Sequence, residues 1–532
     1  MNATYIDYAL TNSFSPTVIK YLENADELKP FYGFRPDLAG FKQLLQHKKN
    51  IAKRSILVKV LNDQYTKLPS GLVSDLSKNN IQSLIHDNTF TITTGHQLNI
   101  FTGPLYFIFK IVTAINLAKD LKAEFPDKNF VPVYWMASED HDFAEINHTQ
   151  IGGKKIAWNQ AVSGATGRVS TEGIQQALNQ YKGILGISES AQELANLVDT
   201  AYTHFEKLAD AMRYLVNALF ARFGLVIIDA DEARLKQDFA PIMEADIIQQ
   251  NSYKNISQTN EKLAETGVHI QVNPREINFF YLLNEVRERI VFENNKYHIL
   301  NTEIVFSEDE LKKEIAQYPE RFSPNVVMRP LYQEVILPNL AYIGGGAEVV
   351  YWMELKANFD FYQVDFPILI LRNSGLLVSK RSAEKAANMD LTLTDFFKPT
   401  DTLKNNWIQV NSQKQLHLNQ YWQELNAVFT RIKSHNIKID PTLGPSTEAI
   451  EKRLEHAVFN LEKKLIKAEK RNYETRLNQV DQVKAELFPG GSLQERNENF
   501  GLFYVKLGSK LIDDLVKNFK PLDFKFTILS ES

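Results

Sequence analysis

The chain has 532 residues, a formal net charge of -4, 44% hydrophobic residues and no cysteine. This length predicts two to four compact units at roughly 100 to 200 residues each, and the composition is that of a folded protein. The small negative charge argues against nucleic acid or an anionic membrane as a partner, and the lack of cysteine excludes disulfides, a thiol nucleophile and thiolate zinc ligands.

The first 85 residues are predicted to form an N-terminal helical arm packed on the core. Ser15 and Pro16 have the spacing of an N-cap and a first helical turn. The chain does not open with a basic segment followed by an apolar run, and no run reaches the roughly 18 apolar residues of a membrane span. A cytoplasmic protein is therefore expected.

The stretch "TTGHQLNIFTGPLYFIFK", residues 93–110, predicts a strand, a turn and a helix. Gly95 is expected to make a sharp turn and Pro104 to lie in the first turn of the helix. Unpaired N–H groups at the start of a helix bind anions, so a phosphate or carboxylate site is expected here. The stretch matches neither GxGxxG nor GxxxxGK[ST], and a structural turn with a hydrogen-bonded histidine is the alternative.

The helix that follows is predicted to be amphipathic. Tyr106, Lys110 and Thr113 share one face, from which Lys110 is expected to reach the same crevice as the turn. The residues expected to form the buried face are Leu105, Ile108, Phe109, Val112, Ile115 and Ala118.

Two further apolar strands, at 129–137 and 224–229, alternate with helical patterns. This alternation predicts an α/β fold with a Rossmann-like parallel sheet and helices on its faces. The catalytic core is expected to span 86–390, with insertions at about 150–223 and 250–325. Residues 326–359 return to an apolar character, which is interpreted as β-rich.

The motif "SEDHDFAEINH" follows the second strand directly. Its crowded ionisable groups suit acid–base chemistry, because neighbouring carboxylates raise one another's pKa values and favour a protonated His141. His141, His148 and a carboxylate could also ligate a divalent ion. The alternative is that Ser138 or Asp140 caps a helix whose first turn is acidic. The ionisable residues concerned are Glu139, Asp140, His141, Asp142 and Glu145.

A third motif, "RPLYQEVILPNLAYIGGGAE", combines a possible anion-binding Arg329 with a glycine triplet at 344–346 that permits close approach of a ligand. The same triplet is also typical of an ordinary loop. "LRNSG" is expected to place Arg372 and Asn373 near the same edge of the sheet.

Residues 391–510 are predicted to form a helical coiled-coil domain, after which 511–532 return to the core. No glycine or proline occurs between Ser446 and Leu487, which predicts one long helix with residues 415–435 as its antiparallel partner. Dimerisation through this hairpin is expected; the alternative is a hairpin folded back on its own core. The apolar seam consists of Leu454, Val458, Leu461, Leu465 and Ala468.

Together with "FVPVYWMA" before the acidic motif and "VIKYLENADELKPFYGFRPDLAGF" in the arm, these motifs resemble one family, the bacillithiol biosynthesis cysteine-adding enzymes (BshC). The resemblance implies a Rossmann-type core with two insertions and a coiled coil that forms a homodimer. It also implies a ligase that joins the cysteine carboxyl group to the amine of glucosaminyl malate in the last step of bacillithiol biosynthesis. ATP, with ADP as a possible product, is the expected source of activation, while the need for a metal stays open. The family is distantly similar to class I aminoacyl-tRNA synthetases, but this chain has "GHQ" instead of HxGH and no KMSKS-like loop.

On this basis the expected catalytic residues are His96, Asp140, His141 and Asp142. Ser138–Asp142 and His148 are assigned to the substrate amine or sugar, and Arg329, Arg372 or Lys110 to malate or phosphate charge. No metal-ligating residue is assigned. The expected substrate- or nucleotide-binding residues are Gly95, Gln97, Thr102, Gly103, Tyr106, Lys110, Ser138, Glu139, His148, Arg329, Gln333, Asn339, Gly344, Gly345, Gly346, Glu348, Arg372 and Asn373.

Two other functions compete with the ligase. The first is another adenylate-forming or nucleotidyl-transferring enzyme with a class I synthetase-like fold. The second is a non-enzymatic scaffold that recruits partners through its coiled coil. Small-molecule substrates, with neither nucleic acid nor membrane, are the partners expected of the enzyme.

Overall fold

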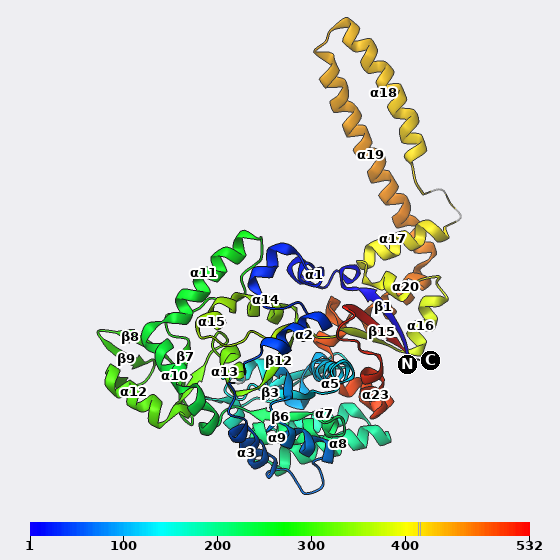
Figure 1. Cartoon of the computed structure of the whole chain (residues 1–532). Coiled ribbons are helices and arrows are strands. Elements are labelled where there is room, and N and C mark those ends of the chain that lie inside the picture. Colours follow the sequence, from blue (N-terminus) through cyan, green and yellow to red (C-terminus); the bar gives the residue numbers. More distant parts are fainter. Residues whose placement is uncertain (50, 413, 415, 532) are drawn as a thin grey trace. The chain divides into compact units, whose positions relative to one another are not determined.

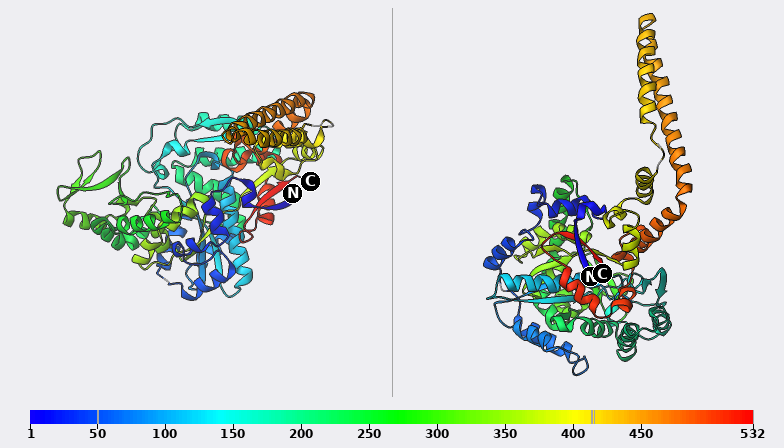
Figure 2. Two further views of the ribbon diagram at one scale, coloured as in Figure 1. Left: turned by 90° about the horizontal axis from the view of Figure 1, so that it is seen from above. Right: turned by 90° about the vertical axis from the view of Figure 1, so that its right-hand side faces the viewer.

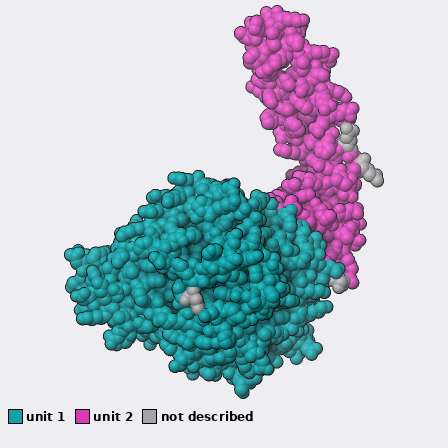
Figure 3. All heavy atoms as spheres, viewed as in Figure 1, with its two compact units in different colours: residues 1–9, 13–376, 492–529 teal, residues 10–12, 377–491, 530–532 magenta. Residues whose placement is uncertain are grey.

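The computed structural model describes residues 1–49, 51–412, 414 and 416–531 (Figure 1). They form two compact units (Figure 3). The first contains residues 1–9, 13–376 and 492–529, and the second contains residues 377–491 with short flanking pieces. The sequence had predicted that the helical domain spans residues 391–510. No helix in the described part of the chain is long and apolar enough to cross a membrane.

The core of the first unit is a five-stranded sheet with the order β13-β12-β2-β3-β6, in which every pairing is parallel. This confirms the Rossmann-like α/β prediction. The strands are β2 (Thr89–His96), β3 (Asn129–Met136), β6 (Val226–Asp229), β12 (Asn339–Gly344) and β13 (Ile368–Leu371). β2 lies at the centre of the sheet. The strands that follow it, β3 and β6, are added on one side, and the later strands β12 and β13 are added on the other. Their carboxyl ends therefore flank a crevice, where open α/β sheets bind ligands.

Helix α5 (Tyr106–Glu124) packs against β2 and β3, and its predicted apolar stripe is buried. The opposite face is buried as well near the start of the helix, with Lys110 only 3% exposed and Thr113 fully covered, whereas Lys119, Asp120 and Lys122 near its end are exposed. The C-terminal segment of the unit also packs on this helix: Phe109 packs edge-on against Phe519, and Asn116 donates to the carbonyl of Phe519. This contact joins residues about 400 positions apart, which helical periodicity cannot indicate.

The turn between β2 and α5 differs from the prediction. Gly95 lies inside β2, paired in register with Trp135, and the strand continues to His96. A Cβ at Gly95 would lie 3.3 Å from the Tyr342 hydroxyl oxygen, so this glycine makes room for a neighbour instead of a turn. The chain turns at residues 101–103, which all have positive φ.

Pro104 also lies before α5 and not in its first turn. Pro104 forms an isolated antiparallel bridge with Asn499. The side-chain amide of Asn499 donates to the carbonyls of Phe101 and Gly103. The turn is therefore held by a residue far along the chain, and its geometry could not be inferred from the local sequence.

The N-terminal arm contains mostly short helices, as predicted. Ser15 caps the first of these and Pro16 occupies its first position. The arm elements are β1 (Asn2–Asp7), α1 (Pro16–Leu22), α2 (Leu38–His47), α3 (Arg54–Tyr65) and α4 (Asp75–Ser83). Phe41 and Leu44 of α2 join the hydrophobic cluster that α5 forms with the sheet.

Two insertions interrupt the sheet. Between β3 and β6 lie α6 (Phe143–Ile146), β4 (His148–Ile151), β5 (Lys154–Ala157), α7 (Gln175–Leu185), α8 (Glu189–His204) and α9 (Leu208–Phe220). Between β6 and β12 lie α10 (Ala233–Gln249), α11 (Asn251–Glu265), β7 (Phe279–Leu282), β8 (Arg287–Glu293), β9 (Lys296–Ile299), β10 (Val305–Phe306), α12 (Glu308–Gln317), β11 (Phe322–Pro324) and α13 (Arg329–Ile336). The strands of the second insertion form a sheet with the order β10-β9-β8-β7-β11 (Figure 2).

The return to the core is less β-rich than predicted. Residues 329–336 are the helix α13, and the glycine triplet leads into α14 (Gly346–Glu354) and α15 (Lys356–Phe361). A helix begins at the glycine triplet because the Glu348 carboxylate accepts from the N–H of Gly345 and so caps α14. The unit ends with α21 (Gln494–Asn497), α22 (Gly501–Leu507), α23 (Lys510–Asn518) and β15 (Lys525–Ser530), which pairs with β1.

The second unit is helical. The chain enters it along β14 (Gly375–Val378) and continues through α16 (Lys380–Ala387), α17 (Thr400–Asn411), α18 (Asn419–Ile439), α19 (Leu443–Asn472) and α20 (Glu474–Leu487). Helices α18 and α19 lie side by side, which confirms the predicted hairpin (Figures 1 and 2). The predicted partner segment begins at residue 415, which lies outside the described residues.

The predicted long helix is broken at Tyr473, between α19 and α20. The ring of Tyr473 packs edge-on against Trp407 of α17, and its hydroxyl donates to the carbonyl of Asn411. These contacts hold Tyr473 out of the helical path. The predicted apolar seam, from Leu454 to Ala468, lies entirely within α19.

Candidate active site

A cavity of about 950 Å³ lies in the first unit at the carboxyl ends of the parallel strands. β2 contributes Gly95 and His96, the end of β3 leads to Ser138, and Arg372 directly follows β13. The sequence-predicted residues that line this cavity are Gly95, His96, Gln97, Tyr106, Lys110, Ser138, Glu139, Asp140, His141, Arg329, Gly345, Gly346, Glu348 and Arg372. The structure therefore brings together residues from all three motifs.

Eight other predicted residues lie outside the lining. Thr102 and Gly103 belong to the buried turn before α5, and Asp142 caps the short helix α6 by accepting from the N–H of Glu145. His148 starts β4, where its Nδ1 faces the Asn147 side chain. The structural turn is an alternative that the sequence had left open, whereas the helix cap is Asp142 and not the expected Ser138 or Asp140.

The remaining four residues lie behind the cavity lining or in the core of the fold. Gly344 ends β12, and Asn373 is buried, with its N–H donating to Thr113 and its side chain to the carbonyl of Lys520. Gln333 and Asn339 are fully buried. Both belong to a polar network behind Arg329.

His96 is buried against aromatic rings, stacked on Phe107 and edge-on to Tyr106. Burial, with a smaller contribution from the nearby Lys110 ammonium, lowers the pKa of His96 to about 3. The imidazole is therefore neutral at physiological pH, and its Nε2 has no hydrogen-bond partner among the described residues. It suits a neutral hydrogen-bonding role toward a ligand better than proton transfer.

Two buried cations in the cavity already have carboxylate partners. The Lys110 ammonium lies 2.5 Å from Glu348 and donates to the carbonyl of Gly95. Burial lowers the pKa of Lys110; burial alone would raise that of Glu348, but the Lys110 charge holds it below its ordinary value. Arg372 pairs with the buried Glu495 at 2.7 Å. These pairs leave little net charge for a ligand.

Arg329 is different, because no carboxylate of the described residues lies within 4.0 Å of its guanidinium. The side chain is half-buried, but its Nη2 is buried and without a hydrogen-bond partner among those residues. Rings of Trp135, Tyr342 and Trp352 surround it at 5.6 to 5.9 Å from their centres. An unpaired cation in such a cage is prepared to bind an anion from the cavity.

A chain of buried amides fixes Arg329 from behind. Its Nη1 donates to Gln333, and Gln333 donates to the carboxylate of Glu334. Asn339 donates to the same carboxylate oxygen and accepts from the hydroxyl of Thr91. Because a carboxylate only accepts, Glu334 sets the orientation of both amides. Gln333 and Asn339 therefore contribute to the site indirectly.

The opposite part of the cavity is acidic. Gln97 donates to Asp140 at 2.7 Å and to Glu145 at 2.8 Å, which joins the β2 loop to the acidic motif. The His141 Nδ1 lies 2.7 Å from the Arg287 guanidinium. Since a guanidinium only donates, this contact makes Nδ1 an acceptor and places the proton of the neutral ring on Nε2. The carboxylates can receive an amine, and His141 can donate to a substrate oxygen.

Four arginines of the cavity were not predicted from the sequence: Arg275, Arg287, Arg289 and Arg496. The first three come from the second insertion, and Arg496 lies in α21 near the end of the chain. Each stands outside any recognisable motif. Only the folded insertion brings them to the sheet edge, and the nearest sequence signal is the alternation of charges in "VRERIVFE".

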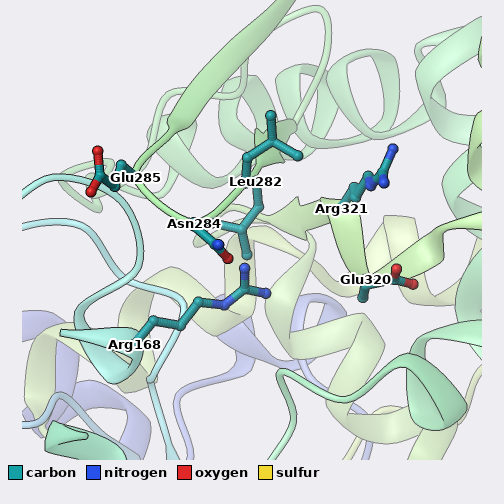
Figure 4. A pocket seen from close by; sticks show the side chains of 7 residues that line it. Arg168, Leu282, Asn284, Glu285, Glu320 and Arg321 are labelled. Atoms are coloured by element: carbon teal, nitrogen blue, oxygen red, sulfur yellow. The ribbon is translucent and has the colours of Figure 1, made fainter. Parts of the chain in front are cut away.

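A smaller cavity of about 630 Å³ lies between Arg168 and residues of the second insertion (Figure 4). The Arg168 guanidinium is turned toward Asn284. Both arginines of this cavity have carboxylate partners, Arg168 with Asp231 and Arg321 with Glu314. The larger cavity, with its unpaired guanidinium, is therefore the candidate site.

No group of three or more histidine, aspartate or glutamate side chains in the described part of the chain is arranged to hold a metal ion. His141 and His148, which the sequence suggested as a ligand pair, do not both face the cavity.

Comparison with known proteins gives matches over nearly the whole chain. Residues 1–373 match the family model described as "Bacillithiol biosynthesis BshC, N-terminal Rossmann-like domain", and residues 375–531 match "Bacillithiol biosynthesis BshC, C-terminal coiled-coil domain". A solved structure from Campylobacter jejuni, described as a "putative arginyl t-RNA synthetase", is 12% identical over 83% of this chain and 98% of its own. Its TM-score of 0.22 is too low to compare the folds.

Proteins named "Putative cysteine ligase BshC" are similar over the full length. That of Flavobacterium johnsoniae is 45% identical, covering 99% of both chains, and that of Flavobacterium psychrophilum is 43% identical with the same coverage. That of Christiangramia forsetii is 40% identical over 100% of this chain and 99% of its own. With both domains matched and identities of this size, the chain belongs to the BshC family of bacillithiol biosynthesis.

Proposed function

We propose that this protein is a ligase that adds L-cysteine to glucosaminyl malate, forming an amide bond in the last step of bacillithiol biosynthesis. Full-length similarity to proteins named as cysteine ligases supports the reaction class. The observation that carries the substrate assignment is the division of the cavity. It offers an unpaired Arg329 for a carboxylate and an acidic group at Asp140 and Glu145 for an amine.

The lining residues suggest a role for each part. Arg329 binds a malate carboxylate, and the Asp140 carboxylate orients the sugar amine and accepts its proton as the amide forms. The neutral His96 and the Nε2–H of His141 hydrogen-bond to oxygens of the reacting groups. ATP would supply the activation that a carboxyl group needs before it can form an amide in water. The arginines left without carboxylate partners fit its negative charge.

Deletion and reconstitution test this function. Deleting the gene in a bacillithiol-producing host without a paralogue should cause glucosaminyl malate to accumulate and bacillithiol to disappear, as measured by mass spectrometry of thiol-labelled extracts. The gene carrying Asp140→Asn should fail to restore bacillithiol, whereas Asp127→Asn, which changes an exposed carboxylate outside the cavity, should restore it. Bacillithiol that persists in the deletion strain excludes the proposal.

The same proposal includes a homodimer formed through the helical hairpin. Along α18 an apolar seam at steps of four and three residues is exposed, with Val428 40% and Ile432 41% accessible. This is the heptad spacing of a coiled coil, and α19 does not cover it. Its members are Tyr421, Leu425, Val428, Ile432 and Ile439, with His435 completing the pattern.

A further inference from the structure

Three of the missed arginines come from one short stretch of the second insertion. Arg275 precedes β7, while Arg287 and Arg289 lie on β8, and we name these three residues the arginine rim. Residues two apart on a strand project from the same face, so the two β8 side chains lie about 7 Å apart along the strand. Phe280, opposite Arg289 in the register, lies beneath Arg287, whose guanidinium carbon is 3.9 Å from the ring centre.

No residue of the arginine rim forms an ion pair with a carboxylate of the described residues. None of the three guanidinium groups has a carboxylate within 4.0 Å among the described residues, although Arg168 and Arg321 of the smaller cavity do. Arg287 contacts only neutral acceptors, the His141 Nδ1 at 2.7 Å and the Ser323 hydroxyl at 3.2 Å. Burial lowers the pKa of Arg287 although the charges of Glu139 and Asp140 oppose the shift, so the guanidinium is partly compensated but lacks a direct counter-ion. An anionic ligand would provide it.

The arginine rim and Arg329 have different surroundings within the same cavity. The charged groups acting on Arg287 are Glu139 and Asp140, on the acidic motif after β3. Arg329 is instead influenced by the Glu348 carboxylate on α14 and lies against the Tyr342 ring of β12. Arg329 offers a single unpaired nitrogen inside an aromatic cage, whereas the rim offers three forked donors along an edge. The first arrangement suits one carboxylate, and the second suits a chain of several charged groups.

We propose that the arginine rim binds the phosphate chain of a nucleoside triphosphate, and that Arg329 separately binds a carboxylate of the second substrate. This assignment rests on the proposed function for the identity of the two ligands, but the division into two anion positions stands on the geometry. It places the phosphates on the second insertion instead of the β2–α5 turn, where Thr102 and Gly103 are buried away from the cavity.

Binding of two small probes to the full-length protein tests the division. Inorganic tripolyphosphate represents the phosphate chain and L-malate the carboxylate, each titrated by calorimetry at fixed ionic strength. The double variant Arg287→Gln/Arg289→Gln should weaken tripolyphosphate binding at least ~10-fold, since each charged hydrogen bond is worth about one such factor. Malate binding should stay within about twofold. Arg329→Gln should give the reverse pattern.

Two further variants make the result decisive. Lys296→Gln removes one positive charge from β9, outside the cavity, and should leave both affinities unchanged; an equal loss there would mean only non-specific attraction and would overturn the proposal. Arg287→Lys keeps the charge if the glutamine variant unfolds, and should still weaken tripolyphosphate more than malate.

The proposal is also overturned if the rim variant and Arg329→Gln each weaken both probes equally, because one shared anion site would then explain the data. It is overturned as well if tripolyphosphate does not bind the unaltered protein. Neither result bears on whether bacillithiol disappears in the deletion strain. Conversely, two selective anion positions in a protein whose deletion leaves bacillithiol intact would retain the division and exclude the cysteine ligase.

Discussion

At the scale of single residues, Arg329 is held more firmly than a surface arginine, and its shape as well as its charge should matter. Arg329→Lys keeps a positive charge but loses the planar guanidinium, in which one nitrogen donates to Gln333 while the other is left for a ligand. We expect the KM for glucosaminyl malate to rise ~10- to 100-fold, the value of one charged hydrogen bond, with a smaller change in kcat. Steady-state kinetics would show this. Arg321→Lys, outside this cavity, should leave KM unchanged; an unchanged KM in Arg329→Lys would remove its assigned role.

The network behind Arg329 predicts a dependence of stability on pH. Burial raises the pKa of Glu334 from its ordinary 4.5 to about 7, although Lys48, Asn339 and Gln333 oppose the shift. The folded protein thus keeps a proton that the unfolded chain has released. The stability that this proton provides is complete below about pH 4.5 and is lost as pH rises to about 7, amounting to at most ~3 kcal/mol.

Glu334→Gln removes this titration. The free energy of unfolding of the unaltered protein, measured in urea, should fall relative to that of Glu334→Gln between pH 4.5 and 7. Other buried acids, such as Glu354, are present in both proteins and cancel in the difference. Parallel profiles over this range would show that Glu334 does not titrate there.

The sequence predicted part of this site for a simple reason. Residues that directly follow parallel strands must meet at one edge of the sheet, so Ser138 and Arg372 could be assigned from strand patterns alone. The protonation behaviour of His96 could not, because it depends on the rings and cations packed around it. The arginine rim could not either, since its position depends on how the second insertion folds back on the sheet.

At the scale of elements, the β2–α5 connection shows why two glycines eight residues apart, Gly95 and Gly103, have different roles. Gly103 has φ of +63°, and a Cβ there would lie 2.6 Å from the Cβ of Asn99. Gly103→Ala is therefore expected to destabilise the protein by at least ~2 kcal/mol, through strain and loss of the turn. Gly183, in the exposed part of α7 with nothing within 4 Å, is the matched control.

Gly183→Ala should instead stabilise the fold by up to about 1 kcal/mol, since alanine favours a helix. Differential scanning calorimetry of both variants measures the two effects. Equal melting temperatures would contradict the strained turn. The sequence had identified Gly95 as the turn, because a glycine after a strand is more often a turn than a position that makes space for a neighbour; the choice depended on Tyr342, which is distant in sequence.

At the scale of the whole molecule, sequence periodicity located the helical hairpin but not the side that is left exposed. In α19 the predicted seam is divided: Leu454 and Leu465 are half-buried, while Leu461 is 51% exposed. In α18, where no seam was predicted, a regular one faces solvent. A heptad pattern shows that a helix has an apolar face, but it does not show whether the partner belongs to the same chain or to a second one.

This exposed seam predicts the oligomeric state. If a second copy covers it, size-exclusion chromatography with light scattering should give twice the 61.0 kDa mass of one chain. Val428→Glu/Ile432→Glu should reduce the mass to that of one chain, because glutamates at facing heptad positions repel each other and resist desolvation. Thr430→Glu/Ser434→Glu adds the same charges to exposed positions off the seam and should leave the dimer intact. A seam variant that keeps the double mass would place the dimer interface elsewhere, and loss of the dimer in both variants would assign the effect to net charge instead of the seam.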